Sequence, residues 1–92
     1  MIRSFKDRNT RRLFAGHRVH AFEGFSAQAK RRLVYLDNAE ALKDQSELRS
    51  NRLEYLSDDR VGQYSIRINR QWRIYFRWED DGPYDAEIVD YH

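Results

Sequence analysis

The sequence predicts an α+β domain in which two N-terminal helices pack on a small, mostly antiparallel β-sheet. In the first half, apolar residues recur at helical spacing between residues 25 and 42. In the second half, apolar and polar residues alternate over 62–68 and 72–78, which is typical of strands with one buried face. Helices that precede a run of antiparallel strands favour an arrangement in which the helices cover one face of the sheet.

The composition is that of a small globular protein. The chain has 92 residues, of which 40% are hydrophobic and 14% aromatic, so we expect one domain over residues 1–92. The absence of cysteine excludes disulfides and thiolate metal sites. The sequence has neither a run of roughly 20 apolar residues nor an apolar stretch after its charged start. We therefore expect no membrane association, no secretory signal and a cytoplasmic location.

Two helices are expected in the first half, after a short first strand at residues 2–5. Residues 6–16 have a helical composition, with Gly16 as the stop signal. The clearest helix covers residues 25–42, with Ser26 as a plausible N-cap. Its buried stripe consists of Ala29, Leu33, Leu36 and Ala39. The basic residues 30–32 lie largely off that stripe, and the polar segment 43–51 is expected to be a loop or a short helical turn.

The strands of the second half each present one apolar and one polar row. The apolar rows are Tyr64, Ile66 and Ile68, and Trp72, Ile74, Phe76 and Trp78. The polar rows are Gln63, Ser65 and Arg67, and Arg73, Tyr75 and Arg77. A turn at 79–83 precedes a last strand at 84–90. We expect the apolar rows to pack under the helices and the arginine and tyrosine row to face outward.

The parity of the loop between the two best strands predicts an unfavourable pair of charges. If both apolar rows share one face, a three-residue loop at 69–71 sets Arg67 directly across from Arg73. Like charges in that position cost a few tenths to about 1 kcal/mol, so an anion is expected nearby. It could be Glu87 or Asp85 on the next strand, or a phosphate, which arginine binds with a planar fork. Tyr75 could then offer a stacking surface to a nucleic acid.

Basic residues are concentrated in two segments. Residues 1–20 contain six Lys or Arg and one acid, and residues 60–77 contain five Arg and no acid. This segregation favours a surface for a polyanion, with solvated faces that neutralise nearby acids as the alternative. His17 and His20 have a spacing that can chelate a metal, but exposed loop histidines are the simpler interpretation.

Three segments together resemble a known family. They are "MIRSF" at the start, "NRLEYLSDDRVGQYSIRINRQWRIYFRW" in the middle and "VDYH" at the end. They resemble the HigB toxins of the RelE/ParE superfamily of bacterial type II toxin–antitoxin systems, across essentially the whole chain. The resemblance implies the RelE/ParE-like microbial RNase fold. It also implies a ribosome-dependent endoribonuclease that cuts mRNA in the A site and so inhibits translation.

The resemblance implies partners as well as an activity. A HigB toxin is silenced by a cognate HigA-like helix-turn-helix antitoxin, through which alone it reaches operator DNA. No metal and no cofactor are implied, because the ribose 2′-OH itself attacks the adjacent phosphorus. Such a reaction needs a base for the 2′ proton, an acid for the leaving 5′ oxygen and cations for the phosphorane.

The resemblance also implies which residues carry the reaction. Arg67 and Arg73 correspond to family arginines that hold the scissile phosphate, and Arg77 is expected to bind RNA beside them. His92 suits the general acid, with Asp90 and Tyr91 orienting it or the RNA.

The expected base departs from the HigB pattern. HigB toxins tend to carry His and Lys where this chain has Glu54 and Ser57. The stretch "LEYLSDDRVGQYSIRI" also resembles the YoeB toxins, in which a Glu at the position of Glu54 is the base. Glu54 is therefore the expected base, with a surface carboxylate on a strand edge as the alternative. Two other functions stay open: a gyrase-poisoning ParE-type toxin, and a weakly active or inactive module that binds RNA and the antitoxin.

Overall fold

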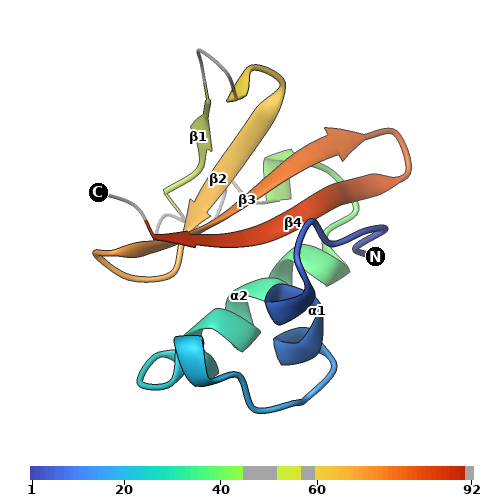
Figure 1. The fold of residues 1–92 in the computed structure, drawn as a ribbon. Coiled ribbons are helices and arrows are strands. Elements are labelled where there is room, and N and C mark those ends of the chain that lie inside the picture. Colours follow the sequence, from blue (N-terminus) through green and yellow to red (C-terminus); the bar gives the residue numbers. More distant parts are fainter. Residues whose placement is uncertain (45–51, 57–59, 91–92) are drawn as a thin grey trace.

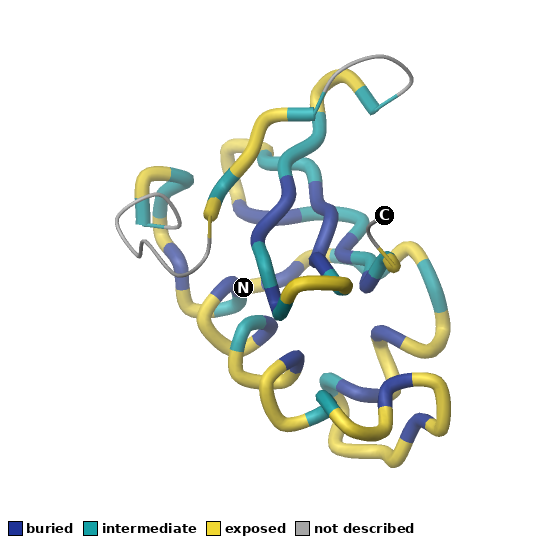
Figure 2. Tube along the Cα trace, turned by 90° about the vertical axis from the view of Figure 1, so that its left-hand side faces the viewer, coloured by how far each residue is buried: buried dark blue, intermediate teal, exposed yellow. Residues whose placement is uncertain are grey.

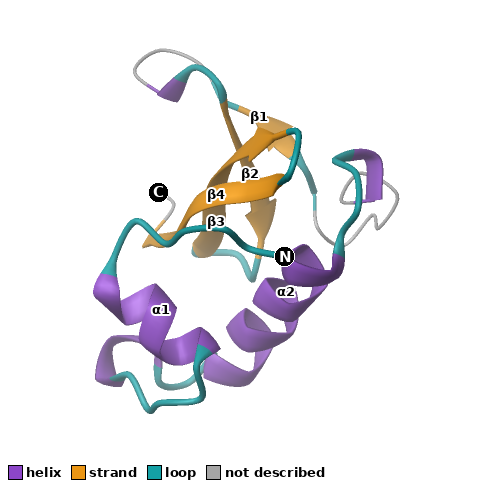
Figure 3. Ribbon diagram, turned by 90° about the vertical axis from the view of Figure 1, so that its right-hand side faces the viewer, coloured by secondary structure: helices purple, strands orange, loops and turns teal. Residues whose placement is uncertain are grey.

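The computed structural model describes residues 1–44, 52–56 and 60–90 and places both helices on one side of an antiparallel sheet (Figures 1 and 3). The helices are α1 (Arg8–Phe14) and α2 (Ser26–Asn38), with a 3₁₀ turn at His20–Phe22 between them. The strands are β1 (Glu54–Tyr55), β2 (Gln63–Arg67), β3 (Trp72–Glu79) and β4 (Gly82–Asp90), which pair in the order β1-β2-β3-β4. The α+β prediction is confirmed. Among the described residues, none of the helices is long and apolar enough to cross a membrane.

The helix boundaries differ slightly from those expected. Asp7 caps α1, because its carboxylate accepts a hydrogen bond from the Thr10 N–H at 3.0 Å. Ser26 is the first residue of α2 and not its N-cap, a position that Phe25 takes without a side-chain hydrogen bond. The helix also ends at Asn38 rather than at residue 42, because Ala39 already has an extended backbone.

The N-terminal segment lies along β4 without becoming a strand. Phe5 forms an isolated parallel bridge with Ala86, and the Arg3 N–H donates to the Pro83 carbonyl at 2.8 Å. The expected first strand at 2–5 is therefore reduced to one bridge. The expected turn at 79–83 is also shorter, because β3 continues to Glu79 and β4 begins at Gly82.

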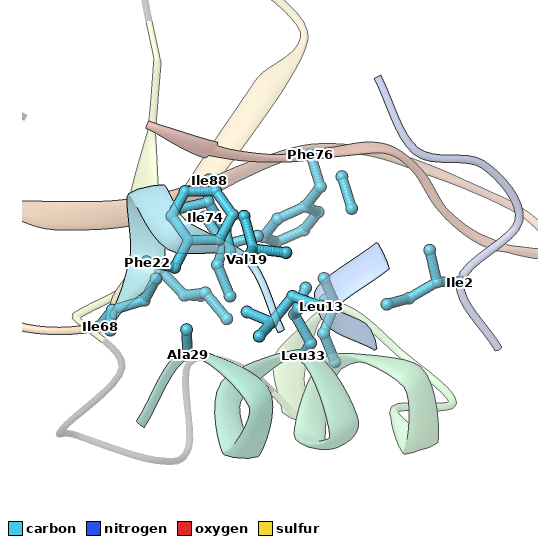
Figure 4. Packing of buried hydrophobic residues seen from close by; sticks show 13 residues of the cluster. Ile2, Leu13, Val19, Phe22, Ala29, Leu33, Ile68, Ile74, Phe76 and Ile88 are labelled. Atoms are coloured by element: carbon cyan, nitrogen blue, oxygen red, sulfur yellow. The ribbon is translucent and has the colours of Figure 1, made fainter. Parts of the chain in front are cut away.

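The core fills the space between α2 and the sheet (Figure 4). Leu33 and Leu36 of α2 are fully buried against a sheet face that includes Ile66, Ile74 and Phe76. The predicted helical stripe and both apolar strand rows thus contribute to the core. Burial of these large apolar side chains supplies most of the stabilisation available to so short a chain.

The middle of the sheet is buried on both faces (Figure 2). Four consecutive residues of β3, from Arg73 to Phe76, are buried, although a strand covered on one face alone would alternate. The expectation that the arginine and tyrosine row faces open solvent is therefore wrong at its centre. The reason is that other groups cover the sheet face turned away from the helices, which we call the outer face: Arg60 lies over Tyr75, and Glu54 and the Arg52 carbonyl contact Arg73.

Candidate functional site

The register between β2 and β3 brings two arginines together on the outer face. Arg67 is the direct cross-strand partner of Arg73, as the loop parity predicted. Ser65 pairs with Tyr75 and Gln63 with Arg77 in the same ladder. Side chains of directly opposed residues point to the same face, so both arginines leave the sheet on its outer face at this end.

Arg73 is the most enclosed of the charged side chains described, with 4% of its surface exposed. Its Nε donates to Ser65 Oγ at 2.7 Å, and its Nη2 donates to the carbonyl groups of Ser65 and Arg52. Its Nη1 lies 3.2 Å from Glu54 Oε1. A buried charge is tolerated when its donors are satisfied in this way, so the position and orientation of Arg73 are fixed by the fold.

Glu54 is the anion beside the arginine pair. The sequence left Glu87 or Asp85 as candidates, and this expectation is corrected: Glu87 contacts Arg60 at 3.1 Å and Asp85 contacts Arg77 at 2.9 Å. Glu54 comes instead from the edge strand β1, where it pairs with Ser65. Its side chain is 46% exposed while one oxygen contacts Arg73. A carboxylate that is accessible to a substrate therefore sits directly beside a fixed guanidinium.

Arg67 completes the positive side of this site. It is half-buried at the end of β2, and none of the described residues pairs with its guanidinium group. Arg67 can therefore use its planar fork for an incoming phosphate, whereas Arg73 is already committed to Glu54, Ser65 and Arg52. Arg73 therefore supports the structure of the site, whereas Arg67 is available to a ligand.

Tyr75 does not offer the stacking surface that the sequence suggested. The Arg60 guanidinium lies 4.8 Å from the centroid of the Tyr75 ring, and Tyr75 is 9% exposed. Arg60 is held there by Glu87 and by Gln63, whose side-chain oxygen is 3.3 Å away. This cation–π contact closes the outer face at its centre, so the open part of the face lies toward Arg67 and Glu54.

Arg77 belongs to a separate cluster at the other end of β3. Its Nε donates to Asp85 and its Nη1 lies 2.7 Å from Glu79. The hydrogen bond with Asp85 raises the pKa of Arg77 and holds the pKa of Asp85 below its ordinary value. Arg77 pairs with Tyr84, whereas Asp90 pairs with Trp72 five residues away along the strand. At about 3.3 Å per residue, the structure does not bring Arg77 and Asp90 together.

The last strand ends next to the position of the arginine pair. Arg73 pairs with Val89, and Asp90 is the next residue and the end of β4. The Asp90 carboxylate accepts a hydrogen bond from the Gln71 side chain at 3.2 Å. Tyr91 and His92 lie outside the described residues, so their predicted roles rest on the sequence.

Nothing in the described part of the chain suggests a metal site. His20 Nδ1 lies 2.9 Å from Glu23, and its side chain is fully exposed. No group of three or more His, Cys, Asp or Glu suited to a metal ion occurs among the described residues. The donors on the outer face, Arg67 and Arg73, are cations and suit an anionic ligand.

A family model described as "RelE-like toxin of type II toxin-antitoxin system HigB" matches residues 3–92 of this chain. The chain belongs to this family of HigB-like toxins. Toxin HigB-1 of Vibrio cholerae serotype O1 is 33% identical over 82 residues, which cover 87% of this chain and 86% of that protein. Among solved structures, the YoeB–YefM complex from Staphylococcus aureus contains a chain of the same fold. That likeness has a TM-score of 0.64 and 17% identity, and it covers 100% of this chain and 98% of the other.

The sequence signal for this candidate site was incomplete at three residues and one strand. Ser65 was assigned to the polar row, but its bond to Arg73 needed the register of the structure. Arg52 contributes a backbone carbonyl, which no side-chain pattern can reveal. Arg60 covers Tyr75 from a segment with no strand periodicity. The β1 strand, only two residues long, is too short for an alternation pattern to predict.

Proposed function

We propose that this HigB-like toxin is a ribosome-dependent mRNA endonuclease that inhibits translation. The observation that carries the proposal is the contact of the half-exposed Glu54 carboxylate with Arg73, directly across the sheet from Arg67. A base and two phosphate-binding cations are the groups that a 2′-OH attack on phosphorus requires. The family and its type II toxin–antitoxin context support the same reaction class.

The proposed reaction needs no metal. Glu54 accepts the proton of the ribose 2′-OH, the 2′ oxygen bonds to phosphorus, and the bond from phosphorus to the 5′ oxygen breaks. His92 gives a proton to the leaving oxygen, so the products are a 2′,3′-cyclic phosphate and a 5′-OH. Arg67 contacts the charged phosphorane, and Arg73, whose own donors stay bonded to Glu54, Ser65 and Arg52, adds its positive charge beside the phosphorane and keeps Glu54 in place.

Three further residues belong to the proposed set. Asp90 and Tyr91 orient His92 or the RNA, because β4 ends at Asp90, one residue after the cross-strand partner of Arg73. Arg77 stays an expected RNA contact at the far end of the outer face, where Asp85 and Glu79 engage it in the free protein. We also propose that the substrate is mRNA in the ribosomal A site, in the cytoplasm. A HigA-like helix-turn-helix antitoxin is the proposed partner, through which alone the toxin reaches operator DNA.

One experiment separates this function from its rivals. The purified protein is added to a cell-free translation extract, and the 5′ ends of the mRNA are mapped with and without ribosomes. Cuts that require ribosomes and end in a 2′,3′-cyclic phosphate support the proposal. Inhibition of gyrase-driven supercoiling without cuts would support a ParE-type toxin. Neither effect would indicate an inactive module that binds RNA and the antitoxin.

A further inference from the structure

A second basic site lies next to the candidate active site, between α2 and the turn from β2 to β3. It is a pocket of about 490 Å³. Its lining consists of Gln28, Arg32, Arg52, Arg67, Ile68, Asn69 and Arg70. Four of these residues are arginines, and none is acidic. A concave surface with four guanidinium groups and no carboxylate in its lining is suited to an anionic ligand.

The fold builds this pocket from the same elements that build the outer face. Arg52 lies two residues before Glu54, which pairs with Ser65 of β2, and it lines the pocket together with Arg67. Arg52 has a left-handed backbone with φ of 46°, and Arg73 donates to its carbonyl group. Arg73 therefore fixes the backbone from which the Arg52 side chain reaches the pocket. The turn between β2 and β3 is fixed by Asn69, whose side-chain oxygen accepts hydrogen bonds from the N–H groups of Gln71 and Trp72.

Three of the four arginines that line the pocket have no charged partner among the described residues. Arg67 lies directly across from Arg73, and Glu54 is paired with Arg73. None of the described residues pairs with the side chains of Arg52, Arg67 or Arg70. Burial, and then the neighbouring Arg31, lower the pKa of Arg32. Placing like charges in direct opposition is destabilising, and a bound polyanion would offset that cost.

We propose that this pocket, which we call the arginine pocket, binds a backbone phosphate of the RNA strand next to the scissile phosphate. The inference rests on the proposed function for the identity of the strand. Arg67 lines the pocket and also lies across from Arg73, so a strand whose scissile phosphate contacts Arg67 continues directly into the pocket. Contacts to the phosphate backbone position a nucleic acid without reading its bases, so the arginine pocket sets register and affinity rather than codon preference. An acidic segment of the antitoxin is the competing ligand.

The test measures binding to RNA that cannot be cut. A short, fluorescent, single-stranded RNA with 2′-O-methyl groups at every position lacks the attacking hydroxyl. Its affinity for the full chain is measured by anisotropy over a range of salt concentrations. The variants are Arg32→Gln, Arg70→Gln and the double variant. The matched control is Arg8→Gln with Arg12→Gln, two exposed arginines of α1 that are outside the pocket lining.

We expect the slope of log K against log salt concentration to become shallower by about 0.7 for each phosphate that the variant no longer neutralises. The arginine pocket holds one phosphate, so the slope for the double variant should be shallower by about 0.7, and the slope for the control pair should change clearly less. Equal changes in both pairs, or no change in either, would overturn the inference. Weaker binding of the purified antitoxin with unchanged RNA binding would overturn it too, and would assign the arginine pocket to the antitoxin.

This measurement is independent of cleavage. If the protein never cuts mRNA but the slope changes as expected, the proposed function fails while the phosphate site stands. If mRNA is cut normally by the double variant and the slope is unchanged, the arginine pocket fails while the proposed function stands. Unchanged thermal midpoints of the variants show that binding, and not folding, is compared.

Discussion

Glu54→Gln is the sharpest test of the proposed reaction, because it removes the base while preserving its shape. The glutamine can still accept a hydrogen bond from Arg73 Nη1, which lies 3.2 Å from the carboxylate oxygen. Arg73 also keeps its bonds to Ser65 and to the Arg52 carbonyl. The variant thus loses a proton acceptor and one negative charge, and little else.

The structure predicts two effects of very different size. Loss of a positioned general base slows a reaction by roughly 10²–10⁴-fold, which is about 2.7–5.4 kcal/mol in the activation barrier. Glu54 is 46% exposed, so solvent screens its ion pair, and the unfolding free energy should fall by no more than about 1 kcal/mol. For a domain of this size that corresponds to a decrease of at most about 4–8 °C in the thermal midpoint.

The assay is single-turnover cleavage of ribosome-bound mRNA, combined with thermal melting of the same preparations. Glu79→Gln is the matched control, because it makes the same chemical change in an ion pair with Arg77, at the far end of β3. Cleavage by the control should remain within a few-fold of the unmodified protein. If Glu54→Gln also stays within tenfold, Glu54 is not the base, and the surface-carboxylate interpretation is correct.

Four further variants test the fold, the second charge cluster and the C-terminal residue. Leu33→Ala and Phe76→Ala should each lower the unfolding free energy by roughly 2–5 kcal/mol in denaturant titrations, because both side chains are fully buried; unchanged midpoints would place them outside the core. The pKa of Asp85 is held below its ordinary value of 3.8, mainly by the hydrogen bond from Arg77. The ionised Asp85 therefore stabilises the folded protein above pH 3.8, and this contribution is lost as the pH falls through the lower pKa of the folded state. Asp85→Asn should therefore flatten the stability profile in acid, and a profile identical to that of the unmodified protein would exclude this contribution. Deletion of His92 should slow cleavage by roughly 10²–10⁴-fold with RNA binding retained; full activity would remove His92 from the mechanism.

The parts of the fold that the sequence predicted are those with a long periodic signal. The stripe that includes Leu33 and Leu36 and the alternation across β2 and β3 each repeat several times, so they define a helix and two strands. Parity together with a three-residue loop then placed Arg67 across from Arg73, because a shift of one residue would have exposed the whole apolar row. Periodicity therefore predicts which residues share a face.

Periodicity does not predict what covers a face. The outer face is enclosed by β1 and by Arg60, which come from segments too short or too irregular to give a repeating pattern. For this reason the sequence placed Tyr75 and Arg73 in the open, whereas the structure buries both. The contact of Glu54 with Arg73 could not be predicted for the same reason. It depends on the pairing of β1 with β2, which no local sequence pattern indicates.

The burial of Arg73 changes how its substitution must be interpreted. Its guanidinium group links Glu54 on one side to the Arg52 carbonyl on the other, so it supports both the proposed base and the arginine pocket. Arg73→Ala would remove a phosphate-binding cation and leave the buried oxygen of Ser65 without its donor, at a further cost of about 1–3 kcal/mol. A loss of toxicity in that variant would therefore combine chemistry, RNA positioning and folding. Glu54→Gln tests the proposed base alone, and the double variant of Arg32→Gln and Arg70→Gln tests the arginine pocket alone. These variants can therefore separate the two roles, whereas Arg73→Ala cannot.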